Sequence, residues 1–324
     1  MRICIVGAGA IGGLLAARLA RTGAQVSVVA RGAHLEAIRT KGLHYRSPTT
    51  SFEVTVEASE SPAQLGTQDF VILTLKAPSL PGIAPQLSPL FGPDTTVVTA
   101  MNGIPWWFCD ALPKPLEGRQ LVSVDPDGIL AGAFPKGPSV GCVVHAGASV
   151  PEPGLVDHAA GEGFIFGGAQ RGVSAQAAAM ADLASQAGLS GTYTEDIHSE
   201  IWLKLIGNMG MGPISALTGA TLAGIASDAD ARPIAAEMMS EAVDVGEALG
   251  LPMDMSVEAR IDLGAELGEF KPSILQDLER GRPMEIDALV TVVCELGQIA
   301  GVPTPTIDTV LALLRGRARR AGLY

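Results

Sequence analysis

The chain begins with the stretch MRICIVGAGAIGGLLAARLARTGAQVSVVAR, residues 1–31. A short apolar segment, Arg2 to Val6, predicts a β-strand, and the residues that follow the glycines have the composition of a helix. A second apolar segment, Gln25 to Ala30, predicts another strand at the distance expected of a βαβ unit. The stretch therefore predicts the start of a Rossmann-type dinucleotide-binding domain.

The turn between the first strand and the helix has the spacing G-x-G-x-x-G. Gly7 permits the tight turn, Gly9 lets a pyrophosphate approach the backbone, and Gly12 lets the helix pack closely on the sheet. The free N–H groups of the helix N-terminus, which includes Ala10 and Ile11, then face the phosphates. In a chain with 39 glycines this spacing alone is weak evidence, but its position between two predicted strands supports it.

The residue after the second strand distinguishes the two nicotinamide cofactors. NAD enzymes usually carry Asp or Glu there, whereas this chain has Arg31, with His34 a turn later. A guanidinium pairs well with the 2′-phosphate of NADP and gains little from a hydroxyl. We therefore predict NADP(H); the alternative is that Arg31 is an ordinary solvated arginine in a loop.

The bulk composition indicates a compact globular protein. The chain has 324 residues, of which 47% are apolar and 17% charged, so it is long enough for two domains and unlike a disordered chain. Its formal net charge of −12 argues against nucleic acid and anionic membranes as partners. No uninterrupted apolar stretch is long enough to span a bilayer.

The cysteines and histidines indicate neither a disulfide framework nor a metal site. The four cysteines are dispersed and form no C-x-x-C pair, which is typical of a reduced cytoplasmic protein. The glycine motif, followed by charge at Arg18 and Arg21, favours a folded βα unit over a signal peptide. His145 and His158 have no second ligand at metal spacing, so we interpret them as structural.

Two further apolar runs predict strands of a parallel sheet buried on both faces, Phe70 to Leu75 and Thr95 to Ala100. Lys76 follows the first run and Asn102 follows the second. Ligands of open α/β sheets bind at the carboxyl ends of strands, so both residues point to the cofactor crevice. The alternatives are a solvent-exposed strand end for Lys76 and a plain turn for Asn102-Gly103.

The remaining segments predict two domains. Residues 139–168 resemble antiparallel strands that extend the sheet, and Ala175 to Ala187 has helical periodicity. Trp106-Trp107-Phe108 either lines a substrate pocket or caps a hydrophobic edge, and we favour the second. From Asp196 onward the chain reads as helical. The predicted architecture is an α/β dinucleotide-binding domain, residues 1–195, followed by an all-α domain, residues 196–324.

A second group of polar residues lies on the helix that begins near Asp196. Glu200, Lys204 and Asn208 recur at four-residue steps, so they share one face, and Gly212 continues the row. Their neighbours are apolar. Because burial disfavours the charge of a lysine and lowers its pKa from about 10.4, a lysine in this setting needs a reason. The alternative is an ordinary surface pair of Glu200 with Lys204.

The same helix contains three glycines within six residues. Glycine costs about 1 kcal/mol relative to alanine at a helical position, so this density implies that something approaches the backbone closely. A cofactor or a tightly packed partner element would fit. The glycines are Gly207, Gly210 and Gly212.

A third group follows near the end of the chain. Ser273 and Glu285 are separated by a break at Gly281 and Pro283, so they need not lie on one helix. Pro283 predicts a new helix start, with Glu285 in the first turn, where the helix dipole favours a negative charge. Complementing that dipole is the alternative role for Glu285.

Five motifs together resemble the ketopantoate reductase family, the 2-dehydropantoate 2-reductases, over most of the chain. The last two are the more specific, because unrelated Rossmann proteins lack them. The motifs are GAGAIGG at residues 7–13, LKAP at 75–78, MNG at 101–103, WLKLIGN at 202–208 and SILQDLERGRPMEID at 273–287.

The resemblance implies an NADPH-binding N-terminal domain, a helical C-terminal domain and a 2-oxo acid bound in the cleft between them. The implied reaction is reduction of 2-dehydropantoate to pantoate, a step of pantothenate biosynthesis, with Lys204 protonating the oxygen that gains charge on hydride transfer. The implied roles are Lys204 as catalytic lysine with Glu285 as its carboxylate partner, Asn208, Ser273 and Asn102 as substrate-binding residues, and Lys76 and Asn102 as cofactor-binding residues.

One position departs from the family pattern. Better-known members have a second asparagine one turn after the residue that matches Asn208, whereas this chain has Gly212. An amide for the hydroxyl end of the substrate is therefore missing. This leaves two alternatives open, a related NADP-dependent hydroxy-acid dehydrogenase with another substrate and a binding protein that senses NADPH without turnover. The apolar helical half is compatible with a homodimer.

Overall fold

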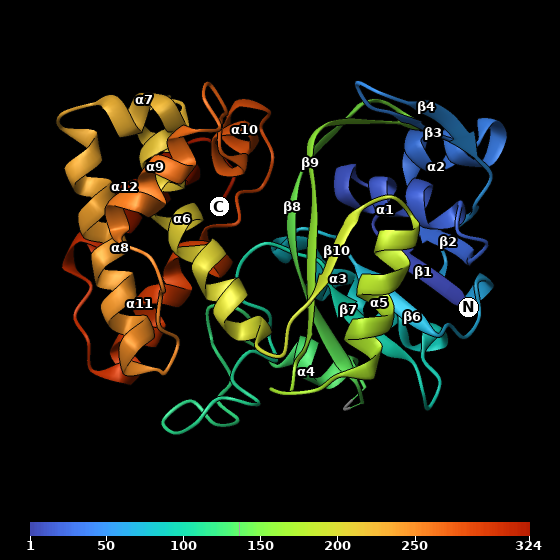
Figure 1. Ribbon diagram of the computed structural model, residues 1–324, viewed down its shortest axis with the longest axis horizontal. Helices are drawn as coiled ribbons and strands as arrows, with labels where there is room; N and C mark the ends of the chain where they lie inside the picture. The colour runs from blue at the N-terminus through green and yellow to red at the C-terminus, as the bar shows by residue number, and fades with distance from the viewer. Residues whose placement is uncertain (136) are drawn as a thin grey trace. The chain divides into compact units, whose positions relative to one another are not determined.

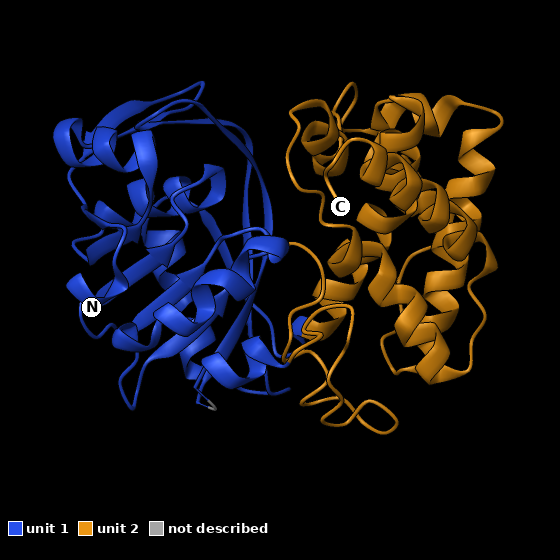
Figure 2. Ribbon diagram, turned by 180° about the vertical axis from the view of Figure 1, so that it is seen from behind, with its two compact units in different colours: residues 1–101, 128–197 blue, residues 102–127, 198–324 orange. Residues whose placement is uncertain are grey.

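The computed structural model describes residues 1–135 and 137–324, which form two compact units (Figure 2). Unit 1 contains Met1–Met101 and Gly128–Ile197, and unit 2 contains Asn102–Asp127 and His198–Tyr324. Residues 102–127, which the sequence analysis assigned to the N-terminal domain, therefore pack with the helical unit. The final change from one unit to the other falls at residue 197, close to the expected boundary at 195.

Unit 1 is built on one ten-stranded sheet with the order β4-β3-β9-β8-β7-β6-β1-β2-β5, and β10 pairs with β9. The strands are β1 Arg2–Val6, β2 Gln25–Val29, β3 Leu43–Arg46, β4 Ser51–Val54, β5 Glu57–Ser59, β6 Phe70–Leu73, β7 Thr96–Thr99, β8 Ser139–Glu152, β9 Leu155–Gly168 and β10 Ser190–Tyr193. The helices are α1 Ala10–Ala20, α2 Gly32–Lys41, α3 Leu80–Ile83, α4 Ile129–Ala133 and α5 Ala175–Gln186.

The centre of this sheet is parallel, as the apolar runs predict. β1 pairs in parallel with β2 and β6, and β6 pairs in parallel with β7 (Figure 1). Val6, at the end of β1, is in register with Val29 and Leu73. The residues that follow these three strands therefore start from the same edge of the sheet, where a dinucleotide-binding fold carries its ligand.

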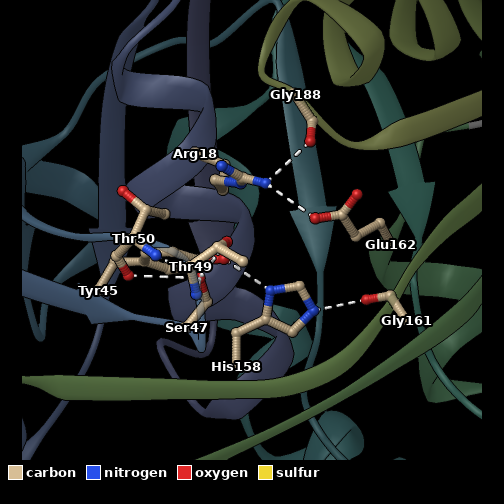
Figure 3. A network of polar contacts seen from close by, with 9 residues as sticks. All are labelled: Arg18, Tyr45, Ser47, Thr49, Thr50, His158, Gly161, Glu162 and Gly188. Carbon is tan, nitrogen blue, oxygen red and sulfur yellow. Dashed lines mark hydrogen bonds and ion pairs between the residues drawn. The ribbon is translucent and has the colours of Figure 1, made fainter.

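The predicted antiparallel segment is a long hairpin of β8 and β9. Beside it, the Tyr45 hydroxyl lies 2.6 Å from Nδ1 of His158, and Nε2 of His158 lies 2.5 Å from the Gly161 carbonyl oxygen (Figure 3). The Arg18 guanidinium lies over the Tyr45 ring and donates a hydrogen bond to the Gly188 carbonyl oxygen at 2.8 Å. His158 is 3% exposed, so it has the structural role that the sequence predicts.

Unit 2 is helical. Its helices are α6 Ile197–Thr218, α7 Leu222–Ser227, α8 Ala231–Ala248, α9 Val257–Ala265, α10 Ser273–Glu279, α11 Val292–Ala300 and α12 Pro305–Arg320, and η5, Asp287–Thr291, is a π-helical turn that leads into α11. α6 belongs to the core of the unit, since Trp202, Ile206 and Met209 are at most 1% exposed. No helix among the described residues is long and apolar enough to cross a membrane.

Candidate active site

The glycine turn of unit 1 has the geometry that its spacing predicts. Gly7 has a φ of +101°, and a Cβ there would lie 2.6 Å from Cδ2 of Leu75. A Cβ on Gly12 would overlap the Gly7 carbonyl oxygen and the Thr74 hydroxyl, whereas a Cβ on Gly9 would enter open space. Gly7 and Gly12 are thus required by the protein itself, and Gly9 leaves room beside the backbone for another group.

A residue that sequence reasoning missed fixes this turn. The Thr74 hydroxyl donates a hydrogen bond to the Gly7 carbonyl oxygen at 2.6 Å, and the Thr74 N–H donates to the Val6 carbonyl oxygen at 3.1 Å. Thr74 follows the last residue of β6. A hydroxyl at the end of an otherwise apolar run was the available signal, because such a group needs a hydrogen-bond partner when it is partly buried.

The helix N-terminus after the turn fits the phosphates of a dinucleotide. Gly9 is the N-cap of α1, no side chain caps the helix, and its first turn contains no acidic residue. The positive end of the helix dipole, with the first N–H groups that include those of Ala10 and Ile11, is therefore available to an anion. A dinucleotide bound there would be held by residues 7–12.

The two basic residues after β2 differ in their surroundings. Arg31 is the exposed N-cap residue of α2, and its guanidinium makes no ion pair with any residue in the described ranges 1–135 and 137–324. His34 instead accepts a hydrogen bond through Nδ1 from the Gly154 N–H at 2.9 Å, and burial lowers its pKa. Of these two residues, Arg31 is therefore the one that offers a positive charge without an ion pair in the described part of the chain. Lys76 follows β6 and is half-buried.

In unit 2, Lys204 and Asn102 are hydrogen-bonded. Nζ of Lys204 donates to Oδ1 of Asn102 at 2.9 Å, and the two residues are 102 positions apart in the chain. Lys204 is half-buried on α6, as is Asn208 one turn later, while the flanking Leu205 and Ile206 are fully buried. The amide oxygen accepts one N–H of the ammonium and thereby helps to orient it.

The three glycines of α6 are covered by side chains from three other helices. A Cβ on Gly207 would overlap the Arg260 guanidinium, one on Gly210 would overlap Met239, and one on Gly212 would lie 3.1 Å from Cγ2 of Ile274. Of the two explanations that the sequence left open, a tightly packed partner element accounts for all three.

The turn that follows Glu285 contacts the segment that carries Asn102. Glu285 is 5% exposed and comes just before the helical residues that begin at Ile286, so it precedes the first turn in which the sequence placed it. Three residues later, the Ala288 carbonyl oxygen accepts a hydrogen bond from the Ile104 N–H at 3.1 Å. The π-helical turn η5 contains this carbonyl, and such turns occur often at functional sites.

Ser273 is the first residue of α10 and is exposed. Its neighbour Ile274 is the residue that covers Gly212, so the start of α10 lies beside the row of polar residues on α6. Unit 2 thus joins Lys204 to Asn102 directly and places the start of α10 next to the same helix.

Trp107 and Phe108 of the aromatic cluster are packed in the core of unit 2. Trp107 is 3% exposed and Phe108 is fully buried, and both rings pack against the ring of His198, with centroids 5.7 and 5.1 Å apart.

The four cysteines are free and buried, and burial raises the pKa of the Cys4 thiol to about 12. In the described ranges no group of three or more His, Cys, Asp and Glu side chains is arranged to hold a metal ion.

Comparison with known proteins assigns the chain to a family. Residues 3–171 match the family described as Ketopantoate reductase PanE/ApbA, and residues 196–318 match Ketopantoate reductase PanE/ApbA C terminal. A 2-dehydropantoate 2-reductase from Mesorhizobium japonicum is 47% identical over 325 residues, which cover 100% of both chains. The chain belongs to the ketopantoate reductase family. The family that its five motifs indicated is thereby confirmed.

Solved structures of the ketopantoate reductase family share the fold. A candidate ketopantoate reductase from Ralstonia solanacearum has a TM-score of 0.95 and 46% identity, and the match covers 100% of this chain and 99% of that one. The 2-dehydropantoate 2-reductase from Methylococcus capsulatus has a TM-score of 0.85 and 28% identity, with 99% and 98% covered. The predicted fold class, a Rossmann-type α/β domain followed by a helical domain, is confirmed. As a member of this family the chain is an NAD(P)-dependent oxidoreductase.

Proposed function

We propose that this protein reduces the ketone of a 2-oxo acid to a 2-hydroxy acid with NADPH, and that its substrate is 2-dehydropantoate and its product pantoate, as in pantothenate biosynthesis. The family and the relative from Mesorhizobium japonicum, a 2-dehydropantoate 2-reductase, support the reaction class. The observation that carries the proposal is the hydrogen bond from Nζ of Lys204 to Asn102, which holds an ammonium on a largely buried helix.

In the proposed mechanism NADPH, when bound, would supply the hydride that the ketone carbon gains. Nζ of Lys204 donates a hydrogen bond to the ketone oxygen and stabilises the negative charge that grows there. The C=O π electrons become the new O–H bond as Lys204 gives up one proton from Nζ. In the reverse direction the neutral amine takes that proton back.

The neighbours of Lys204 position it. Asn102 accepts one N–H of the ammonium and thereby limits its rotation. Glu285, which is 5% exposed, is the proposed carboxylate partner of the lysine. We propose Asn208 and Ser273 as hydrogen-bonding residues for the substrate, together with Asn102. A protein that only senses NADPH would not need the carboxylate of Glu285 or the amine of Lys204.

For the cofactor we propose NADPH rather than NADH. The glycine turn fits the pyrophosphate, and the exposed Arg31 guanidinium, which has no ion pair in the described part of the chain, fits the 2′-phosphate. Lys76 and Asn102 would contact the cofactor from the ends of β6 and β7.

The test is a steady-state panel of 2-oxo acids, each assayed with NADPH and with NADH. We expect 2-dehydropantoate to give the highest kcat/KM and NADPH to be preferred. NADPH binding with no turnover of any carbonyl compound would instead support a sensing protein.

One observation favours a second candidate, a hydroxy-acid dehydrogenase for another 2-oxo acid. Gly212 stands where better-known family members have an asparagine, and Ile274 covers it. An apolar methyl group thus occupies a place where the substrate's hydroxyl end would find an amide. Higher kcat/KM for a 2-oxo acid with an apolar tail than for 2-dehydropantoate would favour this candidate.

A homodimer also stays a prediction. Light scattering coupled to size-exclusion chromatography would test it.

A further inference from the structure

Arg260 of α9 lies directly on the backbone of α6, beside the proposed catalytic lysine. A Cβ on Gly207 would overlap Nη2 and Cζ of Arg260 and would lie 2.8 Å from its Nε. Nε also donates a long hydrogen bond, 3.5 Å, to the Leu203 carbonyl oxygen. The guanidinium therefore occupies the space that the missing side chain of residue 207 leaves.

This guanidinium is a half-buried cation without a negative partner. Among residues 1–135 and 137–324 no carboxylate oxygen lies within 4.0 Å of its nitrogens, and burial lowers its pKa. Burial of a cation is unfavourable unless an anion or several acceptors compensate for it. The Nε hydrogen bond uses one of five N–H donors, so four N–H groups remain for an acceptor.

Space filling alone does not explain an arginine at this position. The comparable gap at Gly210, one turn along α6, is filled by Met239, which has a similar length and no charge. Methionine fills such gaps without the cost of burying a cation. The charge at residue 260 therefore indicates an anionic ligand.

The place where Arg260 contacts α6 indicates which kind of anion it could bind. At about 100° per residue, Gly207 lies about 60° around the helix from Lys204, and Gly212 lies about 80° around it in the other direction. Arg260 covers the first and Ile274 the second. The face that carries Lys204 and Asn208 is thus bordered by the guanidinium on one side and by Ile274 on the other.

We propose that Arg260 determines specificity by binding the carboxylate of the 2-oxo acid. This rests on the proposed function, in which the ketone lies at Lys204 and the carboxylate is attached to the ketone carbon. The planar fork of a guanidinium fits a carboxylate through two parallel hydrogen bonds. Ser273, which the family resemblance assigns to the substrate, is uncharged and supplies no counter-charge.

The experiment compares one charged and one uncharged form of the same ketone, 2-dehydropantoate and its freshly dissolved lactone. kcat and KM are measured with NADPH for the wild type, Arg260→Met, Arg260→Lys and the control Arg119→Met. Arg119 is an exposed arginine of unit 2 that donates to the Pro115 carbonyl oxygen. Methionine keeps an unbranched chain over Gly207 and removes the charge together with the N–H donors, including the long hydrogen bond to the Leu203 carbonyl oxygen.

We expect Arg260→Met to raise KM for the acid by roughly 10- to 100-fold and to leave kcat/KM for the lactone within about twofold. Arg260→Lys loses less, because it keeps the charge but not the fork. Arg119→Met behaves as wild type. An unchanged KM for the acid, or an equal loss with acid and lactone, overturns the proposal, since a purely structural role would affect both substrates alike.

A wild-type protein that reduces neither compound would reject the proposed function, and the role of Arg260 is then decided by calorimetry with oxamate, a carboxylate isosteric with a 2-oxo acid. Binding that weakens about tenfold or more in Arg260→Met supports a carboxylate site, and equal binding overturns it. If Arg260→Met does not fold, the same comparisons are made with Arg260→Lys and the wild type.

Discussion

Lys204 donates a hydrogen bond through Nζ to Oδ1 of Asn102 at 2.9 Å, although 102 residues separate them in the chain. Asn102 is the first residue of a segment that leaves unit 1 after β7, packs with the helices of unit 2, and returns at Gly128. The lysine is therefore oriented by a residue that lies far from it in the chain but packs in the same unit.

The first prediction concerns Lys204 itself. Lys204→Ala removes the proposed proton donor, so we expect kcat to fall by about 10²- to 10⁴-fold while the Kd for NADPH changes little. Stopped-flow or steady-state NADPH oxidation measures the first quantity and fluorescence titration the second. Lys41→Ala, which alters an exposed lysine of α2, is the control. Turnover like that of the wild type in Lys204→Ala would rule out the proposed role.

The second prediction separates two glycines of the same turn. In Gly9→Ala the new methyl group enters open space, so we expect an unchanged Tm and a Kd for NADPH raised by roughly tenfold. In Gly12→Ala the methyl group overlaps the Gly7 carbonyl oxygen and the Thr74 hydroxyl, so we expect a loss of about 1–3 kcal/mol in the free energy of unfolding.

Thermal unfolding and NADPH titration of both variants distinguish these effects. Gly82→Ala is a matched control, because a Cβ there meets no atom within 4 Å and the backbone has no positive φ. A Gly9→Ala variant that binds NADPH as tightly as wild type would show that no pyrophosphate approaches this backbone.

The third prediction concerns the choice of cofactor. Arg31→Ala removes the exposed guanidinium after β2, so we expect KM for NADPH to rise by roughly 10- to 100-fold and KM for NADH to change by less than about threefold. Arg21→Ala, an exposed arginine over the Phe52 ring in the same unit, controls for loss of charge. Equal effects on both cofactors would mean that Arg31 does not contact the 2′-phosphate.

The fourth prediction is a pH dependence of stability. Burial lowers the pKa of His34 in the folded protein below its ordinary value of about 6.5, so the unfolded chain binds the proton more readily. Below pH 6.5 protonation therefore favours unfolding, and stability falls as the pH drops toward the lowered pKa. We expect urea midpoints to decrease from pH 7.5 to pH 5.5, and to decrease less in His34→Gln, whose amide oxygen also accepts from the Gly154 N–H. Identical pH slopes in the two proteins would contradict this.

The features that could be predicted from the sequence are those that local patterns determine, such as strand bounds and the residues that share a helix face. β1 was predicted from Arg2 to Val6 and is observed with those bounds, and the four-residue steps of Lys204 and Asn208 needed only the helical repeat. Thr74, Arg260 and the partnership of Lys204 with Asn102 were not predicted. Each joins segments far apart in the chain, and periodicity carries no information on which distant side chain meets a given backbone position.

The segment 102–127 illustrates the same limit. Its residues follow a strand of the sheet, so chain order placed them in the N-terminal domain, yet Trp107 and Phe108 are buried against His198 of unit 2. Apolar burial, rather than proximity in sequence, decides which core a segment joins.

The last prediction concerns the polar network beside the hairpin (Figure 3). Nε2 of His158 faces the Gly161 carbonyl oxygen, which only accepts, so Nε2 donates there, and Nδ1 shares a hydrogen bond with the Tyr45 hydroxyl. Tyr45→Phe leaves that buried nitrogen without its hydrogen-bond partner, and we expect the free energy of unfolding to fall by about 1–3 kcal/mol with no change in NADPH affinity. Tyr193→Phe, which removes an exposed hydroxyl of the same unit, is the control. Because the Tyr45–His158 hydrogen bond links β3 to β9 and includes no residue of the glycine turn, a loss of NADPH affinity without loss of stability would contradict its structural role.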